Sequence, residues 1–144
     1  MAAWASTLGG CAYAVGRAPV RSATVHLEPV VVLAPEIGLR EELEAAVARE
    51  LDRLGAGGGA MPLNVAVTSA AVRSVALGAA VQEARLTVSF STPVAEVSLS
   101  GRRAFALSPD DPAATAAARA QAYAALADEL VADGLRQLLL VGEP

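Results

Sequence analysis

The clearest strand pattern in the chain lies at residues 81–91, Val-Gln-Glu-Ala-Arg-Leu-Thr-Val-Ser-Phe-Ser. Apolar and polar side chains alternate along it, which is the period of a β-strand with one buried face. The side chains expected to face the core are Leu86, Val88 and Phe90. Those expected on the opposite face are Arg85, Thr87, Ser89 and Ser91. The alternation predicts a sheet that is apolar on one side and polar on the other.

A second strand is expected at residues 63–75, where apolar residues again alternate with polar ones. Simple alternation would place Arg73 on the apolar side of this strand. A β-bulge near residues 69–71 would correct this, because one extra residue shifts the following side chains to the other face. We therefore expect Arg73 to point outward and Val72 to point inward.

Two more segments have strand character. Residues 97–107 carry apolar side chains at alternate positions and contain Gly101. They predict either one long strand kinked at Gly101 or two shorter strands. Residues 23–32 are rich in β-branched residues but contain Pro29, which cannot donate to a central ladder. This strand is therefore expected to be bulged there or to lie at a sheet edge.

Residues 35–54 have the period of an amphipathic helix. Its apolar stripe consists of Leu39, Leu43, Val47, Leu51 and Leu54. Pro35 and Glu36 suit the first turn, where one N–H is unbonded in any case and negative charge is favoured. The glycine-rich residues 55–59 are expected to end the helix. They lack the Gly-Lys-Ser/Thr ending of a phosphate-binding loop and follow a helix instead of opening one.

A second helix is predicted from Pro112 to about Leu140, because Asp111 and Pro112 suit the N-cap and first helical positions. Its apolar side is expected to hold Tyr123, Leu126, Leu130 and Leu138. The alanines expected to permit close approach are Ala116, Ala120 and Ala127. Gly134 is the position at which the helix could be interrupted, since glycine costs about 1 kcal/mol relative to alanine.

The element order β-α-β-β-β-α predicts an α+β fold. Two helices would pack on one face of a mostly antiparallel four-stranded sheet, because each element has one apolar side to bury. Residues 23–140 are expected to form a single domain. The uncovered sheet face would then carry serine, threonine, arginine and glutamate.

Composition excludes several classes of function. The 144-residue chain has 11 Lys plus Arg, all arginine, against 15 Asp plus Glu and a formal net charge of −4. An acidic chain is poorly suited to nucleic acid. One cysteine and one histidine leave too little for a Cys/His metal site or a thiol–imidazole pair. We expect no enzyme, cofactor or metal, with His26 a surface residue and Asp110–Asp111 a helix cap.

The N-terminus has the character of an exported protein. Residues 1–10 are small, apolar and uncharged, which is typical of a truncated signal peptide. Leu8-Gly9-Gly10-Cys11 resembles a bacterial lipobox, so Cys11 would be lipidated and residues 11–22 would form its tether. The alternative is that Cys11 is an ordinary small buried thiol. No apolar run reaches the roughly 18 residues of a membrane-spanning helix.

Three patterns together resemble the LptE family of lipopolysaccharide-assembly lipoproteins. Residues 10–13, Gly-Cys-Ala-Tyr, followed by Gly16, are similar to the family's lipidated start. Residues 35–43 are similar to the beginning of its first helix. Residues 105–112, followed by an alanine-rich helix that ends in leucine, are similar to its last strand and second helix.

The resemblance implies a non-enzymatic lipoprotein at the periplasmic face of the outer membrane. Such a protein would be anchored through acylated Cys11, would plug an LptD-type β-barrel, and would bind lipopolysaccharide. Arginine suits the phosphates of that lipid and the carboxylates of a barrel. The candidate contacts with lipopolysaccharide or with the barrel are Arg102 and Arg103, extended by Arg73 and Arg85. Alternatively, these arginines are solvated residues that discourage strand aggregation. The alternative function is an auxiliary periplasmic lipoprotein of another lipid or ABC-type transport system.

Overall fold

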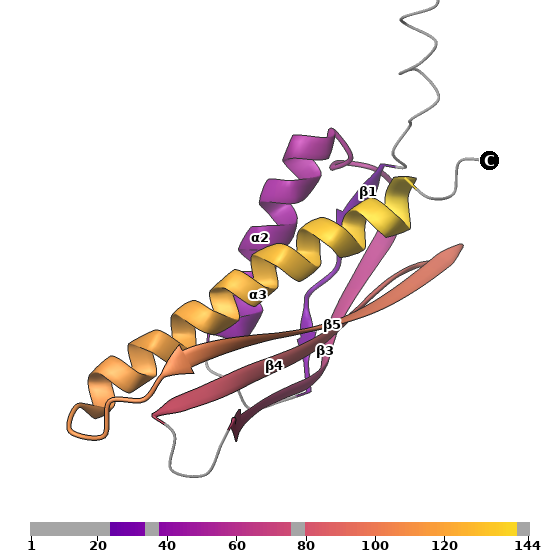
Figure 1. The fold of residues 1–144 in the computed structure, drawn as a ribbon. Helices are drawn as coiled ribbons and strands as arrows, with labels where there is room; N and C mark the ends of the chain where they lie inside the picture. The colour runs from indigo at the N-terminus through magenta and orange to yellow at the C-terminus, as the bar shows by residue number, and fades with distance from the viewer. Residues whose placement is uncertain (1–23, 34–37, 76–79, 141–144) are drawn as a thin grey trace, which may run out of the picture.

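The computed structural model describes residues 24–33, 38–75 and 80–140. Both helices lie on the same side of one mixed sheet (Figure 1). The elements in chain order are β1 (Val25–Leu27), β2 (Val31–Val32), α2 (Leu39–Leu54), β3 (Met61–Ser74), β4 (Val81–Thr92), β5 (Ala95–Ala106) and α3 (Pro112–Leu140). The sheet order is β1-β3-β4-β5, and β2 also pairs with β3. The predicted α+β class is confirmed.

The first predicted strand is divided into two short ones. β1 and β2 both pair with β3 in parallel, and the segment between them contains Pro29. The sheet therefore has five strands where four were expected, and its remaining pairings are antiparallel. The division at Pro29 and the edge position agree with the expected effect of proline on a ladder.

β3 contains the predicted bulge. The register with β4 shifts between Val67 and Ser69, slightly earlier in the chain than expected. Beyond the shift Val72 is partly buried against the core and Arg73 is exposed, as the pattern required. The bulge therefore brings Arg73 onto the polar side of the sheet.

β5 is one continuous strand, and Gly101 causes no break in its register with β4. The glycine has a packing role instead. A Cβ atom at Gly101 would lie 2.9 Å from Cδ2 of Leu126 in α3. The missing side chain therefore allows α3 to approach the middle of the strand.

The core lies between the sheet and the two helices. The predicted stripe of α2 is buried from Leu39 to Leu51, and Leu54 is partly buried. The sheet contributes Leu63, Val65, Val67, Ala84, Leu86, Val88 and Phe90, all at most 1% exposed. Burial of each large side chain stabilises the fold by about 1.5–3 kcal/mol.

α3 is not interrupted at Gly134, contrary to the possibility raised by its low helix propensity. Gly134 is buried, and a Cβ atom there would collide with the ring of Phe90. Among the alanines expected to permit close approach, Ala127 is buried, but Ala116 and Ala120 are exposed. Ala118, between these two, is partly buried and packs against the core, so the first part of α3 turns only one side toward the sheet.

The helix ends show how the sequence sets the boundaries. α2 begins at Leu39 after Gly38, whose φ is 79°, and ends at Gly55, whose φ is 66°. Pro35 and Glu36 lie outside the described residues. At the start of α3, Oδ1 of Asp111 accepts a hydrogen bond of 3.1 Å from the backbone N–H of Ala114, so the predicted cap is confirmed.

The expected signal peptide at 1–10, the tether at 11–22 and Cys11 also lie outside the described residues. Within the described segments, neither helix combines the length and the apolar character that crossing a bilayer requires.

Candidate functional site

The face of β3, β4 and β5 opposite the helices is polar, and we call it the open face. Its side chains form rows across the three strands, because antiparallel partners project to the same side. The rows are Ser69–Thr87–Ser100, Ala66–Ser89–Ser98 and Asn64–Ser91–Glu96. Oγ1 of Thr87 and Oγ of Ser100 lie 2.8 Å apart in a hydrogen bond. The open face is therefore a shallow polar surface of mostly small side chains.

Three arginines meet at one end of the open face, and we call Arg73, Arg85 and Arg102 the arginine cluster. Arg85 lies opposite Arg102 on β5, while Arg73 lies opposite Glu83 on β4. The cluster borders a hollow of about 600 Å³. The lining residues are Ser69, Ala71, Arg73, Arg85, Thr87, Ser100, Gly101 and Arg102.

Glu83 is the carboxylate of this site. Nε of Arg85 donates a hydrogen bond of 2.7 Å to Oε1 of Glu83. That bond is the main reason that the pKa of Glu83 lies below its usual range, and the positive charges of Arg85, Arg102 and Arg73 add to the effect. Since three guanidinium groups share one carboxylate, the cluster keeps a positive surplus.

This arrangement suits an anion with more than one charged oxygen. A guanidinium group can donate two parallel hydrogen bonds to a phosphate or a carboxylate. Within the described chain, no carboxylate lies within the 4.0 Å of an ion pair from the guanidinium of Arg73 or Arg102. Both groups are therefore available to a ligand, while Arg85 is held in place by Glu83.

Arg103 does not join the cluster. It lies opposite the buried Ala84, so it belongs to the helix side of β5, where it is exposed at the strand edge. There it borders a second hollow, of about 320 Å³, between β5 and α3. The alternation of side chains along β5 already indicates that Arg102 and Arg103 lie on opposite faces, because Arg103 is an even number of residues from Leu99 and Phe105. The same reasoning would have placed Glu83 beside Arg85, two residues later on the same strand.

His26, the single histidine of the chain, contacts neighbouring protein groups at the surface. His26 is exposed, with Nδ1 3.1 Å from the carbonyl oxygen of Gly59 and Nε2 3.1 Å from Oε1 of Glu28. The described segments contain no group of three or more His, Cys, Asp or Glu residues that could hold a metal ion. His26 is therefore a surface strand residue, as expected from the sequence.

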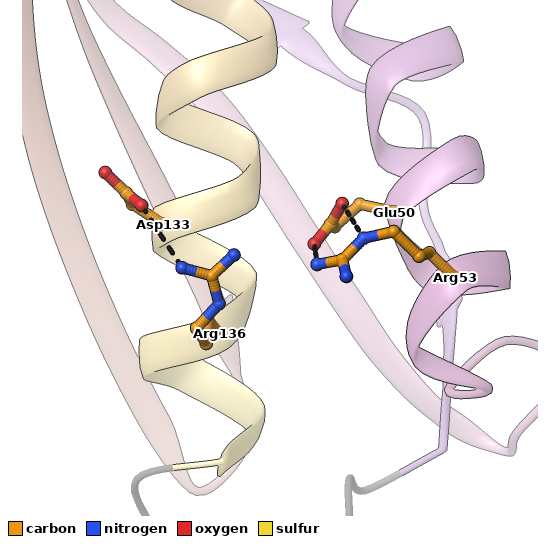
Figure 2. Close-up of polar contacts among 4 residues, drawn as sticks. All are labelled: Glu50, Arg53, Asp133 and Arg136. Atoms are coloured by element: carbon orange, nitrogen blue, oxygen red, sulfur yellow. Dashed lines mark hydrogen bonds and ion pairs between the residues drawn. The ribbon is translucent and has the colours of Figure 1, made fainter.

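A second set of charges lies between the two helices. Figure 2 shows Glu50 bound to Arg53 on α2, and Asp133 close to Arg136 on α3. Burial opposes ionisation of Glu50, but the hydrogen bond from Arg53 is the larger influence and lowers its pKa, as do the charges of Arg53 and Arg136. Because these groups lie on the helix side of the sheet, we assign them to helix packing and not to the open face.

No known family model matches the chain, and a search of curated proteins finds no match. Solved structures do match. The fold is one that bacterial lipoproteins use. A minor lipoprotein from Acinetobacter baumannii is 16% identical with a TM-score of 0.57, covering 83% of this chain and 92% of its own. Rare lipoprotein B from Shewanella oneidensis is 15% identical with a TM-score of 0.56, covering 78% and 91% respectively.

A protein of the DUF330 family from Xanthomonas campestris is 18% identical with a TM-score of 0.56, covering 81% of this chain and 86% of its own. At these identities the likeness shows the fold alone. The likeness extends over most of both chains in each case.

Proposed function

We propose that the chain is a non-enzymatic lipoprotein that assists lipopolysaccharide assembly by plugging and supporting an LptD-type outer-membrane β-barrel. The observation that carries the proposal is the division of the sheet into two unlike faces. Both helices cover the apolar face, while the open face carries hydroxyl side chains and the arginine cluster. A polar surface of this kind suits a barrel lumen, which is itself polar and wet.

The resemblance at Cys11 supplies the membrane anchor in this proposal. An acylated Cys11 would hold the domain at the periplasmic face of the outer membrane, with residues 11–22 as the tether. One acyl chain binds a membrane only marginally, so more than one chain is required. The fold shared with a minor lipoprotein and with rare lipoprotein B supports a lipoprotein of this general type.

The arginine cluster supplies the lipid contact. Lipopolysaccharide carries phosphates, which guanidinium groups bind with two hydrogen bonds at once. Arg73 and Arg102 reach the hollow from two different strands, with Arg85 between them. A phosphate in the hollow would therefore be met from both sides.

Two measurements test the proposal. The tagged chain, purified from its native membrane, should carry acyl groups on Cys11 and retain a large outer-membrane barrel. Recovery of a different transporter would instead support an auxiliary lipoprotein of another lipid or ABC-type system. An unmodified Cys11 in the native protein would contradict the anchor, and a chain recovered without any barrel would contradict the plug.

The lipid contact has its own test. In a binding titration with purified lipopolysaccharide, Arg73→Gln/Arg102→Gln should weaken binding about tenfold or more, because hydrogen bonds between charged groups contribute about 1.5–3 kcal/mol each. Arg73→Gln/Arg103→Gln is the matched control, since it removes the same charge but only one member of the cluster. Equal losses in both double variants would show that general charge, and not the cluster, attracts the lipid.

A further inference from the structure

The outer edge of β5 is a long and regular strand edge. β5 is the last strand of the sheet, and no other strand in the described part of the chain pairs with its far side. It runs for 12 residues without proline, and its register with β4 has no bulge. Proteins usually shorten, bend or cover such edges, because the free N–H and C=O groups pair readily with another strand.

The hydrogen bonds of β5 show which residues offer those groups. The N–H of Leu107 donates to the carbonyl oxygen of Ala80 at 2.8 Å, directly beyond the Val81–Ala106 pair. Antiparallel pairs alternate between bonded and non-bonded, so the odd-numbered residues of β5 bond to β4. The residues whose backbone groups point to the free edge are Glu96, Ser98, Ser100, Arg102, Ala104 and Ala106.

Charge is distributed unevenly along this edge. Glu96 lies near the start of β5 and Arg102 near its end, and both side chains are exposed. Neither makes an ion pair with another described residue. We infer that the free chain forms a two-fold symmetric dimer in which β5 pairs antiparallel with β5 of a second copy, with Leu99 opposite Leu99.

The charges select this register. In a two-fold symmetric interface each contact occurs twice, with residue i of one copy facing residue j of the other and the reverse. Opposite charges on β5 must therefore lie at equal distances from the centre of the pairing. Centring on Leu99 brings Glu96 opposite Arg102 at both ends, with outward-pointing backbone groups meeting one another. Centring on Ser98 would pair Glu96 with Ser100, and centring on Ser100 would pair it with Ala104. Opposite charges across an interface fix its register as well as its partner.

The same register accounts for two other features of this edge. Val94, at 81% exposure the most exposed large apolar side chain among the described residues, would lie opposite Ala104 of the second copy. Ala104 borders the 320 Å³ hollow beneath α3, together with Phe105 and Ala118. The first half of α3 exposes mainly alanine there, so small side chains would face a second copy on that side of the joined sheet.

This inference goes beyond the proposed function, because it concerns the chain before it meets a barrel. Pairing through β5 would occupy Arg102 with Glu96 of the second copy, so the dimer and the lipid-bound or barrel-bound chain would be alternatives. The two ideas can fail separately, since the dimer is measured with the purified chain in the absence of barrel and lipid.

The first experiment is sedimentation equilibrium of the full chain carrying Cys11→Ser, which removes acylation and adventitious disulfides. The chain should form a concentration-dependent dimer. Glu96→Arg and Arg102→Glu should each raise the dimer Kd about tenfold or more, because like charges then face each other. Glu96→Arg/Arg102→Glu should restore dimerisation. A monomer at every concentration, or a double variant as weak as the singles, would overturn the proposal.

Two further variants keep the test independent of the charges. Ser98→Pro removes an outward N–H without touching the ladder to β4, so it should abolish the dimer while thermal melting shows a folded chain. Leu99→Cys should crosslink two copies by oxidation, because opposed non-bonded residues have Cα atoms about 4.5 Å apart, within disulfide range. Val97→Cys, opposite Gly101, should not. A dimer that survives Ser98→Pro, or crosslinks equally through Val97→Cys, would contradict β5 pairing in this register.

Discussion

Arg85 of β4 lies directly opposite Arg102 of β5, and both side chains are on the open face of the sheet. Like charges in opposite positions destabilise a strand pair. Glu83 offsets part of the repulsion by accepting a hydrogen bond from Arg85, but it offers no comparable bond to Arg102. Unfavourable local arrangements such as this pair of like charges occur most often at functional sites. The opposed arginines therefore mark the arginine cluster as the candidate site.

The first prediction follows from that repulsion. Arg102→Gln should raise the free energy of unfolding by about 0.2–1 kcal/mol, because it removes one member of a like-charged cross-strand pair. Urea denaturation at low ionic strength, at a protein concentration where the chain is monomeric, measures the change. Arg103→Gln, opposite Ala84, should have a smaller effect, and added salt should reduce the gain. A loss of stability in Arg102→Gln would mean that the cluster has a structural role.

The second prediction concerns pH. The pKa of Glu50 is lowered in the folded chain, chiefly by the hydrogen bond from Arg53. A group with a depressed pKa in the fold stabilises it above the unfolded pKa, about 4.3 for glutamate, and that contribution disappears as pH falls through the folded value. Glu50→Gln should therefore be less stable than the natural chain at neutral pH.

Denaturation in a pH series checks this prediction. The difference in free energy of unfolding between Glu50→Gln and the natural chain should disappear as the pH falls below about 4. Arg53→Gln should weaken the same pH dependence, because it removes the hydrogen bond that lowers the pKa. A gap that stayed constant across the acid range would show that Glu50 acts through packing and not through its charge.

The third prediction tests the contact between α3 and β4. Gly134→Ala should lower the free energy of unfolding by up to about 2 kcal/mol. Overpacking against the buried ring of Phe90 costs about 1–3 kcal/mol, and the better helix propensity of alanine offsets about 1 kcal/mol. Phe90→Leu should make Gly134→Ala less damaging, since a smaller side chain leaves space for the new methyl group. Equal effects in both backgrounds would exclude this contact as the cause.

The fourth prediction tests the beginning of α3 with two neighbouring residues. Asp111→Ala should lower the free energy of unfolding by about 1 kcal/mol, because Oδ1 of Asp111 accepts a hydrogen bond from Ala114. Asp110→Ala changes the same charge one residue earlier and should have a much smaller effect. Thermal or urea unfolding of the two variants gives the comparison, and equal losses would show that general charge near the helix end matters more than the cap.

Alternation along the strands made most of the fold predictable. It placed Leu86, Val88 and Phe90 in the core, and the wrong parity of Arg73 indicated the bulge. Gly134 could not be interpreted from local propensity, because its role depends on a ring more than 40 positions away in the chain. Propensity describes a residue in isolation, and a tertiary contact can reverse its meaning.

The sequence indicated the three arginines of the cluster, but not that Arg103 lies apart from them or that Glu83 joins them. Arg102 and Arg103 are neighbours in sequence, yet β5 projects them to opposite sides of the sheet. Arg73 reaches the cluster only because the bulge occurs before it. Which arginines converge therefore depends on the register of three strands, and alternation within one strand cannot supply that register.

The most direct test of the central claim is photocrosslinking in living cells from two positions. A photoreactive residue in place of Ser89, in the middle of the open face, should crosslink to a large outer-membrane barrel protein. The same residue in place of Ala48, exposed on α2, should not. Crosslinks to a barrel from Ala48 but not from Ser89, or to no barrel from either position, would contradict docking through the open face.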